Sequence, residues 1–173
     1  MKSLTVLFLI LCSRFVFANE SCSLADIKLT DDSPQAEKLF YTGTCHYRNE
    51  QYEKSVALWK ELSLLDDIPD EYAELQISAL SNLGYMLFFG YGVEENKAEA
   101  IDYWNRAIAL GHTEAEYHLC HAYADPEVST YNPRKALPHC EKAKLIYRGI
   151  EEKSEGDKTI LKQVNRYLKH LKG

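Results

Sequence analysis

The sequence predicts an all-α protein, a right-handed α-solenoid of about three helix-turn-helix repeats followed by a C-terminal capping helix. Apolar residues recur at helical spacing along most of the chain, and no alternating strand pattern is evident. Glycine and proline are sparse and lie mostly at the joins between helical stretches. In addition, a set of positions recurs after 36 residues, which is typical of solenoids whose hairpins pack on their neighbours.

The first 18 residues are interpreted as an export signal. Lys2 supplies the positive start, an apolar stretch follows, and the run VFA ending at Ala18 is a small-residue cleavage site. The apolar stretch is shorter than the roughly 18 residues that a membrane span needs. Cleavage near Ala18 would place a single domain, residues 19–173, in the periplasm or outside the cell. Cleavage before Cys12, with attachment of a lipid, is the alternative.

The charge of the chain is moderately acidic. It carries 20 Lys and Arg against 26 Asp and Glu, a formal net charge of −6, and loss of the signal would change this to −8. Such a balance argues against a nucleic-acid backbone or an anionic membrane surface as the partner, and it would suit a basic protein.

Helical periodicity divides the chain into seven stretches and a short N-terminal segment. Apolar side chains at helical spacing define the packing face of the last stretch, as in Ile160, Val164 and Leu168. Helices are expected near 35–48, 51–65, 71–89, 96–110, 113–124, 133–148 and 157–171. They group into repeats near 35–68, 71–111 and 112–148, with a cap over 157–172.

The joins follow from the residues that occupy them. Gly90 can take the left-handed conformation that ends a helix, and Gly92 relieves crowding where the chain reverses. Asn132 can cap the helix that Pro133 opens, whereas Pro138 lies inside the same helix and is expected to kink it.

Small and bulky positions recur between the second and third repeats, where two helices must approach closely. The set Leu83, Gly84, Ala100, Trp104 and Ala107 is repeated 36 residues later by Leu119, Cys120, Ala136, Cys140 and Ala143. The first repeat follows the same plan with a shorter bend, and its positions look like the tetratricopeptide pattern: Leu39, Gly43, His46, Tyr52, Ser55, Trp59 and Leu62.

The second repeat, LGYMLFFGYGVEENKAEAIDYWNRAIALGHTEA over residues 83–115, resembles the Sel-one-like repeat, a relative of the tetratricopeptide repeat. The small pair, the glycine loop, the Lys97-Ala98 pair, the tryptophan and the Ala-x-x-x-Gly segment occur in the family's order. The third repeat departs from this pattern, because Asp125-Pro126 replaces the glycine loop. The resemblance implies a protein-binding scaffold.

Four cysteines follow the expected signal and allow three pairings. The repeat alignment places Cys120 and Cys140 at facing positions of one hairpin, so they are expected to form a disulfide, and Cys22 and Cys45 then remain to pair. This pairing of cysteines resembles that of cysteine-rich Sel-one-like proteins. The alternative is a zinc site built from Cys120, Cys140 and three histidines nearby, His118, His121 and His139.

By analogy with tetratricopeptide hairpins, the first helix of each pair is expected to line the concave side. This implies an aromatic strip for partner binding, made of Phe40, Thr44, Tyr47, Ser81, Tyr85, Phe88, Phe89, Tyr117, His121 and Asp125. Interfaces use tyrosine and phenylalanine in this way, and a groove can capture a peptide or helix.

No hydrolase elbow, zincin pattern or phosphate loop occurs, so neither catalysis nor a cofactor is expected. The resemblance extends to small exported immunity proteins that neutralise type VI secretion phospholipase effectors. An adaptor for envelope assembly or motility is the alternative within the same class. A hydrolase acting on cell-wall-related β-lactams is the alternative from another class.

Overall fold

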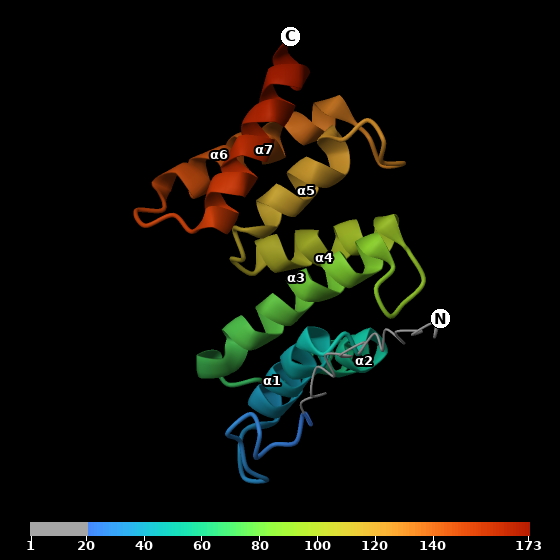
Figure 1. Ribbon diagram of the computed structural model, residues 1–173, viewed down its shortest axis with the longest axis vertical. Coiled ribbons are helices and arrows are strands. Elements are labelled where there is room, and N and C mark those ends of the chain that lie inside the picture. Colours follow the sequence, from blue (N-terminus) through green and yellow to red (C-terminus); the bar gives the residue numbers. More distant parts are fainter. Residues whose placement is uncertain (1–20) are drawn as a thin grey trace, which may run out of the picture.

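The computed structural model describes residues 21–173, and in this part of the chain seven α-helices follow one another without a strand (Figure 1). The expected signal peptide and Cys12 lie outside the described residues. The helices are α1 (Gln35–Arg48), α2 (Tyr52–Ser63), α3 (Ala73–Phe89), α4 (Lys97–Ala109), α5 (Ala115–Ala124), α6 (Pro133–Gly149) and α7 (Glu155–Lys172).

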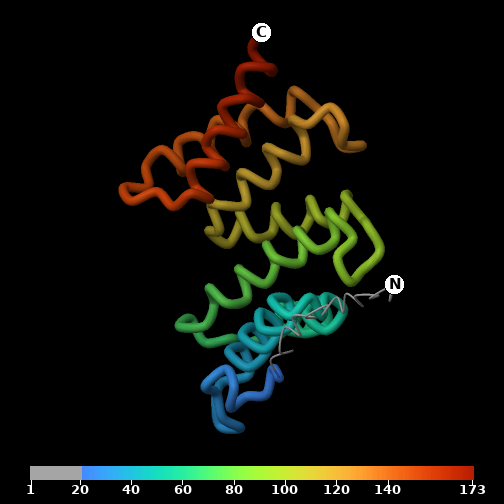
Figure 2. The backbone as a smooth tube through the Cα atoms, viewed as in Figure 1, coloured from blue at the N-terminus to red at the C-terminus, as the bar shows by residue number. Residues whose placement is uncertain are grey.

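The helices form hairpins that stack in chain order along the long axis of the molecule (Figures 1 and 2). α1 packs on α2, α3 on α4 and α5 on α6, while α2 contacts α3 and α4 contacts α5. α7 packs on both α6 and α5 and closes the C-terminal end. The prediction of an all-α helical-repeat solenoid is confirmed. Within residues 21–173, no helix combines the length and the apolar character needed to cross a membrane.

The helix ends lie within a few residues of the predicted ones. The expected helix over 71–89 begins with a 3₁₀ turn at Asp70–Tyr72 before α3 starts. α7 starts two residues earlier than predicted, because Ser154 forms a capping box with Asp157. Asn96 and Asn132 accept backbone hydrogen bonds at the starts of α4 and α6.

A glycine–tryptophan contact joins the two helices of each of the first two hairpins. A Cβ atom on Gly43 would lie 2.7 Å from Trp59 Nε1, and one on Gly84 would lie 2.4 Å from Trp104 Nε1. Each indole also donates a hydrogen bond to the backbone carbonyl three residues before the glycine. The absence of a side chain on the first helix therefore lets the indole of the second reach the backbone.

In the third hairpin a disulfide takes the place of this contact. Cys120 on α5 and Cys140 on α6 are bonded and fully buried, and their Cα atoms are 4.6 Å apart. One turn before Cys120, the buried Glu116 carboxylate accepts contacts from His139 Nδ1 at 2.6 Å and Lys142 Nζ at 2.9 Å. The α5–α6 pair is thus held by a covalent link and by the contacts of the buried Glu116 carboxylate with His139 and the exposed Lys142.

Replacing both Cys120 and Cys140 by alanine is expected to lower the free energy of unfolding by about 3 kcal/mol. The bond joins residues 20 positions apart, and a loop of this size restricts the unfolded chain by about that amount. Denaturant titration without reductant measures the change. An unchanged midpoint would show that packing alone holds the third hairpin.

The bend between α3 and α4 is formed by two glycines in the left-handed region. Gly90 has φ +72° and ends α3, and the Tyr91 amide donates to the Met86 carbonyl. Gly92 has φ +66°, and a Cβ there would lie 2.3 Å from the carbonyl carbon of Tyr52, at the start of α2. The bend therefore packs directly on the backbone of the preceding hairpin.

Pro138 lies inside α6, which continues through it as a single helix. Proline has no backbone N–H, so the Arg134 carbonyl receives no hydrogen bond from position 138, and this loss is the reason for expecting a kink. Both residues are exposed near the start of the helix, so water can satisfy this carbonyl.

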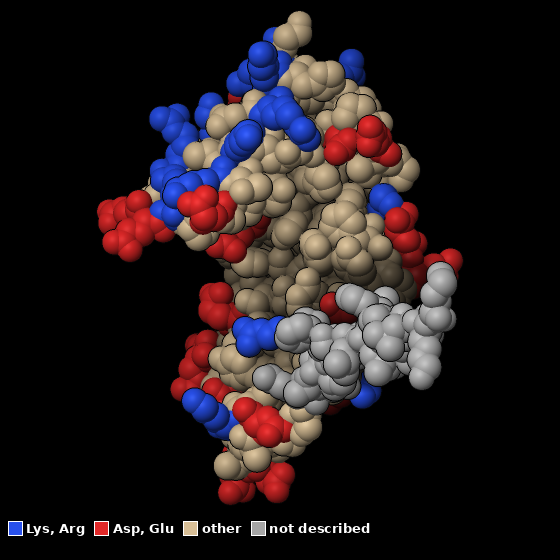
Figure 3. All heavy atoms as spheres, in the orientation of Figure 1, with Lys and Arg blue, Asp and Glu red and all other residues tan. Residues whose placement is uncertain are grey.

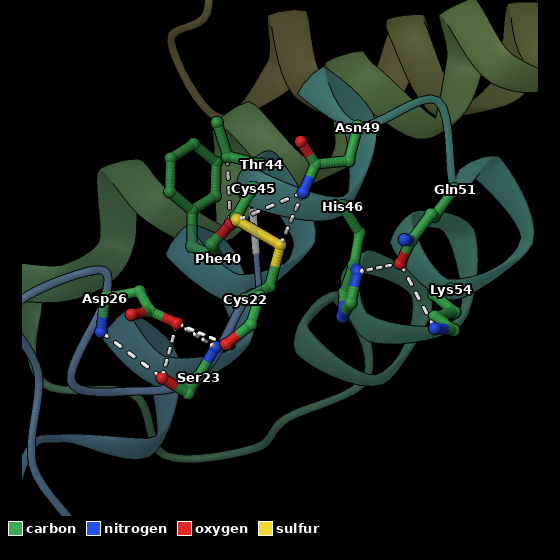
Figure 4. The surroundings of a disulfide bond; sticks show 11 residues. Cys22, Ser23, Asp26, Phe40, Thr44, Cys45, His46, Asn49, Gln51 and Lys54 are labelled. Carbon is green, nitrogen blue, oxygen red and sulfur yellow. Dashed lines mark hydrogen bonds between the residues drawn. A yellow bond between two sulfur atoms is a disulfide. The ribbon is translucent and has the colours of Figure 1, made fainter. Parts of the chain in front are cut away.

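The segment before α1 is attached to it by the disulfide between Cys22 and Cys45, whose Cα atoms are 5.7 Å apart (Figure 4). Asp26 accepts hydrogen bonds from the hydroxyls of Ser21 and Ser23, which lower the pKa of its carboxyl group. Asn49 donates from its amide to Cys22 Sγ at 3.3 Å. Both disulfides have the pairing expected from the sequence.

Candidate functional site

A cavity of about 450 Å³ lies between α1 and α3 on the concave side. The residues that line it are Phe40, Thr44, Tyr47 and Arg48 from α1, Trp59 from α2, Ser81, Asn82, Tyr85 and Met86 from α3, and His118 from α5. We call this cavity the concave groove. Five of the residues expected on the concave side lie in it.

Helical spacing places these side chains in one row on each helix. Thr44, Tyr47 and Arg48 follow Phe40 by four, seven and eight residues on α1, so the four side chains share a face. The Thr44 hydroxyl donates to the Phe40 carbonyl at 2.9 Å, which satisfies it within its own helix (Figure 4). The groove therefore presents mainly apolar and aromatic surface.

Arg48 is the charged residue that lines the groove, and it also lines a second cavity of about 420 Å³ on the other side of its row. Phe40 and Thr44 are shared by the two cavities as well. The second cavity reaches the disulfide-linked segment at Asp26 and Lys28. A partner lying across α1 could thus contact both hollows and the Arg48 guanidinium between them.

Aromatic rings form a connected surface along the groove and beyond its edge. The ring centroid of Tyr47 is 5.8 Å from that of Trp59, and the Tyr85 ring lies 4.8 Å from Phe89 and 6.2 Å from His118. Burial raises the pKa of the Tyr85 hydroxyl, so the phenol stays protonated and uncharged at neutral pH.

His118 closes the far wall of the groove. Its imidazole stacks on the Trp104 indole, with ring centroids 5.0 Å apart and planes 11° apart. Burial lowers the pKa of His118 to about 4, and nearby His112 and His121 act in the same direction. The imidazole is therefore neutral at physiological pH and contributes an uncharged, flat surface.

Lowering the pH from about 7.5 to 5 is expected to reduce the free energy of unfolding through His118 by up to about 2 kcal/mol. The folded pKa of about 4 lies below the ordinary 6.5, so protons bind preferentially to the unfolded chain between these values. This stability is complete above pH 6.5 and is lost as the pH falls toward 4. Because His118 is partly exposed in the groove, the figure is an upper value.

Urea titrations of wild type and His118→Gln at several pH values measure this contribution. The variant should lose part of the dependence between pH 6.5 and 5, whereas His170→Gln, at an exposed position on α7, should keep the wild-type slope. Identical slopes in wild type and His118→Gln would contradict the assignment.

Of the two phenylalanines predicted to contact a partner, Phe88 is buried in the core and Phe89 lies at the edge of the concave groove. Phe88 is only 2% exposed and packs on Trp104 with ring centroids 5.2 Å apart, so it belongs to the core and cannot meet a partner. Phe89, one residue later, is 43% exposed beside Tyr85. Successive helical residues differ by about 100° in direction, so the Phe88 ring points into the core while the Phe89 ring is exposed.

The remaining predicted residues lie on α5 or at its end, away from the groove. Tyr117 packs edge-on against Tyr147 of α6. His121 Nδ1 lies 2.7 Å from the Tyr167 hydroxyl of α7, and that hydroxyl donates to Asp125 at 3.2 Å. α7 therefore engages this end of the strip, while the His121 ring also stacks on Phe89 with ring centroids 6.3 Å apart.

The zinc alternative is inconsistent with this geometry. Cys120 and Cys140 are bonded to each other, so their sulfurs are not thiolate ligands. His139 contacts Glu116, His121 contacts Tyr167 and His118 stacks on Trp104. The five residues point to separate partners and do not converge on one site.

The groove also contains five residues that were not expected on the concave side from the sequence: Arg48, Trp59, Asn82, Met86 and His118. A signal for two of them was present, because Asn82 and His118 are 36 residues apart and occupy the same position in successive repeats. Arg48 follows Thr44 by one helical turn and could have been found from the same face.

A scan against protein-family models matches the Sel1 repeat at residues 77–112 and again at 113–144. These matches extend from within α3 to within α6, and they meet between the second and third hairpins. A search of curated proteins finds no match. Sel1 repeats generally serve as protein–protein interaction scaffolds and are typically not catalytic. The chain therefore contains two Sel1 repeats, which together span residues 77–144.

Proposed function

We propose that this protein is an exported scaffold that binds a partner protein by holding an apolar segment in the concave groove. The observation that carries the proposal is the groove itself, which is lined by aromatic side chains from α1, α2 and α3 and has Arg48 as its charged residue. Tyrosine, tryptophan and arginine are the side chains that contribute most to protein interfaces.

The size of the groove suits a short segment of chain rather than a whole domain. A cavity of about 450 Å³ accommodates a few side chains, and the adjoining cavity across α1 extends the contact. An amphipathic helix that inserts apolar residues from successive turns would match this surface. The Arg48 guanidinium would pair with a carboxylate on such a segment.

Two disulfides and the signal-like N-terminal residues support export to an oxidising compartment. Both bonds lie within single repeats or their attached segment, and each stabilises a solenoid that has few repeats and therefore poorly buried ends. Cleavage near Ala18 and release into the periplasm are part of this proposal.

The finer proposal is that the partner is a toxic effector of the type VI secretion phospholipase class, which the protein neutralises in the periplasm. Its support is the resemblance in size, export signal, small repeat number and acidity. An immunity protein acts by occupying its target, so a rigid preformed groove would suit the task. The rival within the class is an adaptor for envelope machinery.

Affinity capture followed by mass spectrometry tests both the scaffold proposal and the immunity proposal. The capture is made from the envelope of the producing cell under oxidising conditions. The scaffold proposal expects one stoichiometric protein partner. Immunity requires that this partner be toxin-like and encoded beside the gene, whereas a component of envelope machinery would support the adaptor. Recovery of no stoichiometric partner would contradict the scaffold.

A further inference from the structure

Charge is distributed unequally along the solenoid. Residues 133–172, which include α6 and α7, contain 11 Lys and Arg and 5 Asp and Glu, whereas residues 21–132 contain 7 and 20. Figure 3 shows Lys and Arg gathered over the end formed by α6 and α7, with Asp and Glu predominant around the opposite end. The acidic net charge of the whole chain therefore conceals a basic end.

The basic residues of α7 form one ridge. Lys158, Lys162, Arg166, Lys169 and Lys172 are exposed and follow one another at three or four residues, so they share a face about 21 Å long. We call this face the basic ridge. The opposite face of α7 carries the buried residues Val164, Tyr167 and Leu168.

The centre of the basic ridge is less compensated than its ends, because Arg166 shares a cavity with Asp125 and Glu127 but forms no ion pair with either. Lys158 and Lys172, at its two ends, pair with Glu155 and Glu141. Within residues 21–173, no carboxylate forms an ion pair with Lys162, Arg166 or Lys169. A terminal helix of a solenoid needs a polar outer face, but mixed charges would satisfy that need without the repulsion of a single sign.

The composition of the ridge distinguishes between classes of partner. Protein interfaces are poor in lysine and rely on aromatic or aliphatic anchors, and the exposed positions of α7 offer no such anchor. The outer row of lysines on this helix suits a partner surface that is negatively charged and has no fixed shape, because the apolar face of the helix is already buried in the core. Anionic lipid headgroups provide such a surface.

We propose that the basic ridge binds the surface of a membrane that contains anionic phospholipids, with α7 lying along the membrane plane. The acidic residues of 21–132 are repelled by the same surface, so they would orient that part of the molecule away from it. This site is separate from the concave groove, and it revises the expectation that the net charge argues against an anionic membrane.

Co-sedimentation with vesicles tests the proposal on the oxidised chain. Binding is expected to vesicles of phosphatidylethanolamine with about 30% phosphatidylglycerol at about 0.05 M salt, and not to vesicles of phosphatidylcholine. It should weaken strongly at about 0.3 M salt because the attraction is screened. The triple variant Lys162→Gln/Arg166→Gln/Lys169→Gln should bind roughly 100-fold more weakly, at about fivefold for each charge removed.

The matched control removes three exposed lysines from the acidic part of the chain, Lys28→Gln/Lys54→Gln/Lys60→Gln. It changes the net charge by the same amount and should bind the anionic vesicles nearly as well as wild type, because salt screens charges that lie away from the membrane. Equal weakening in the two variants, or equal binding to phosphatidylcholine, would overturn the proposal. Tighter binding to poly-glutamate or to a duplex oligonucleotide than to the vesicles would overturn the assignment to lipid.

Discussion

Replacing Gly92 by alanine is expected to lower the free energy of unfolding by about 4 kcal/mol. The position has φ +66°, where an L side chain is strained, and a Cβ would lie 2.3 Å from Tyr52 C and 2.4 Å from Glu53 N. These are backbone atoms, so no rotamer change can relieve the contact. The bend would have to move away from α2, which separates the first two hairpins.

Gly90→Ala is the matched control, because it has a similar backbone conformation without the contact. Its φ is +72°, and the nearest atoms to a Cβ are at 3.5 Å or more. It should therefore cost only the backbone strain, about 1–2 kcal/mol. Chemical denaturation of both variants measures the difference. Equal losses of stability would contradict the close packing of the bend on α2.

The fold could be predicted from the sequence because its closest contacts recur in the sequence. The small residue and the bulky residue of each hairpin mark where two helices meet, as at Gly84 and Trp104. The same alignment places Cys120 and Cys140 opposite each other, where the disulfide lies. Such contacts can be recognised in the sequence because equivalent positions of successive repeats pack in the same way.

The binding surface was predicted less well because it depends on how neighbouring hairpins cross. Phe88 and Phe89 are identical in type, and the pattern of one helix does not reveal which of them meets Trp104. The engagement of His121 and Asp125 by Tyr167 depends on where α7 packs, 42 or more residues later in the chain. Long-range placement of this kind leaves no local signal.

Net charge was similarly uninformative about the surface. The total of −6 is the sum of an acidic part, residues 21–132, and a basic part, residues 133–172. A partner interacts mainly with the charge of the surface that it contacts. The helical spacing of Lys162, Arg166 and Lys169 was present in the sequence. Counting charges by segment and by face, rather than over the whole chain, would have found the ridge.

Removing the Tyr85 side chain is expected to weaken binding of the captured partner by roughly 30-fold or more. Tyr85 lines the concave groove and lies beside Phe89, Tyr91 and His118, so it links the groove to the exposed rings at its edge. Interface tyrosines at such central positions contribute about 2 kcal/mol or more on truncation. The fold should persist, because Tyr85 is only partly buried.

Tyr131→Ala is the matched control for this truncation. Tyr131 is 39% exposed and lines a different hollow, formed with Ile101 of α4 and Lys135 of α6 on the opposite helices of the hairpins. It should change the affinity less than twofold if the partner occupies the concave side alone. Thermal unfolding of each variant separates loss of binding from loss of folding.

The affinity of the purified partner for wild type, Tyr85→Ala and Tyr131→Ala, measured by titration calorimetry, tests the central claim most directly. Binding through the concave groove predicts a large loss for Tyr85→Ala with wild-type affinity for Tyr131→Ala. A folded Tyr85→Ala variant that binds as tightly as wild type, or a loss confined to Tyr131→Ala, would contradict it.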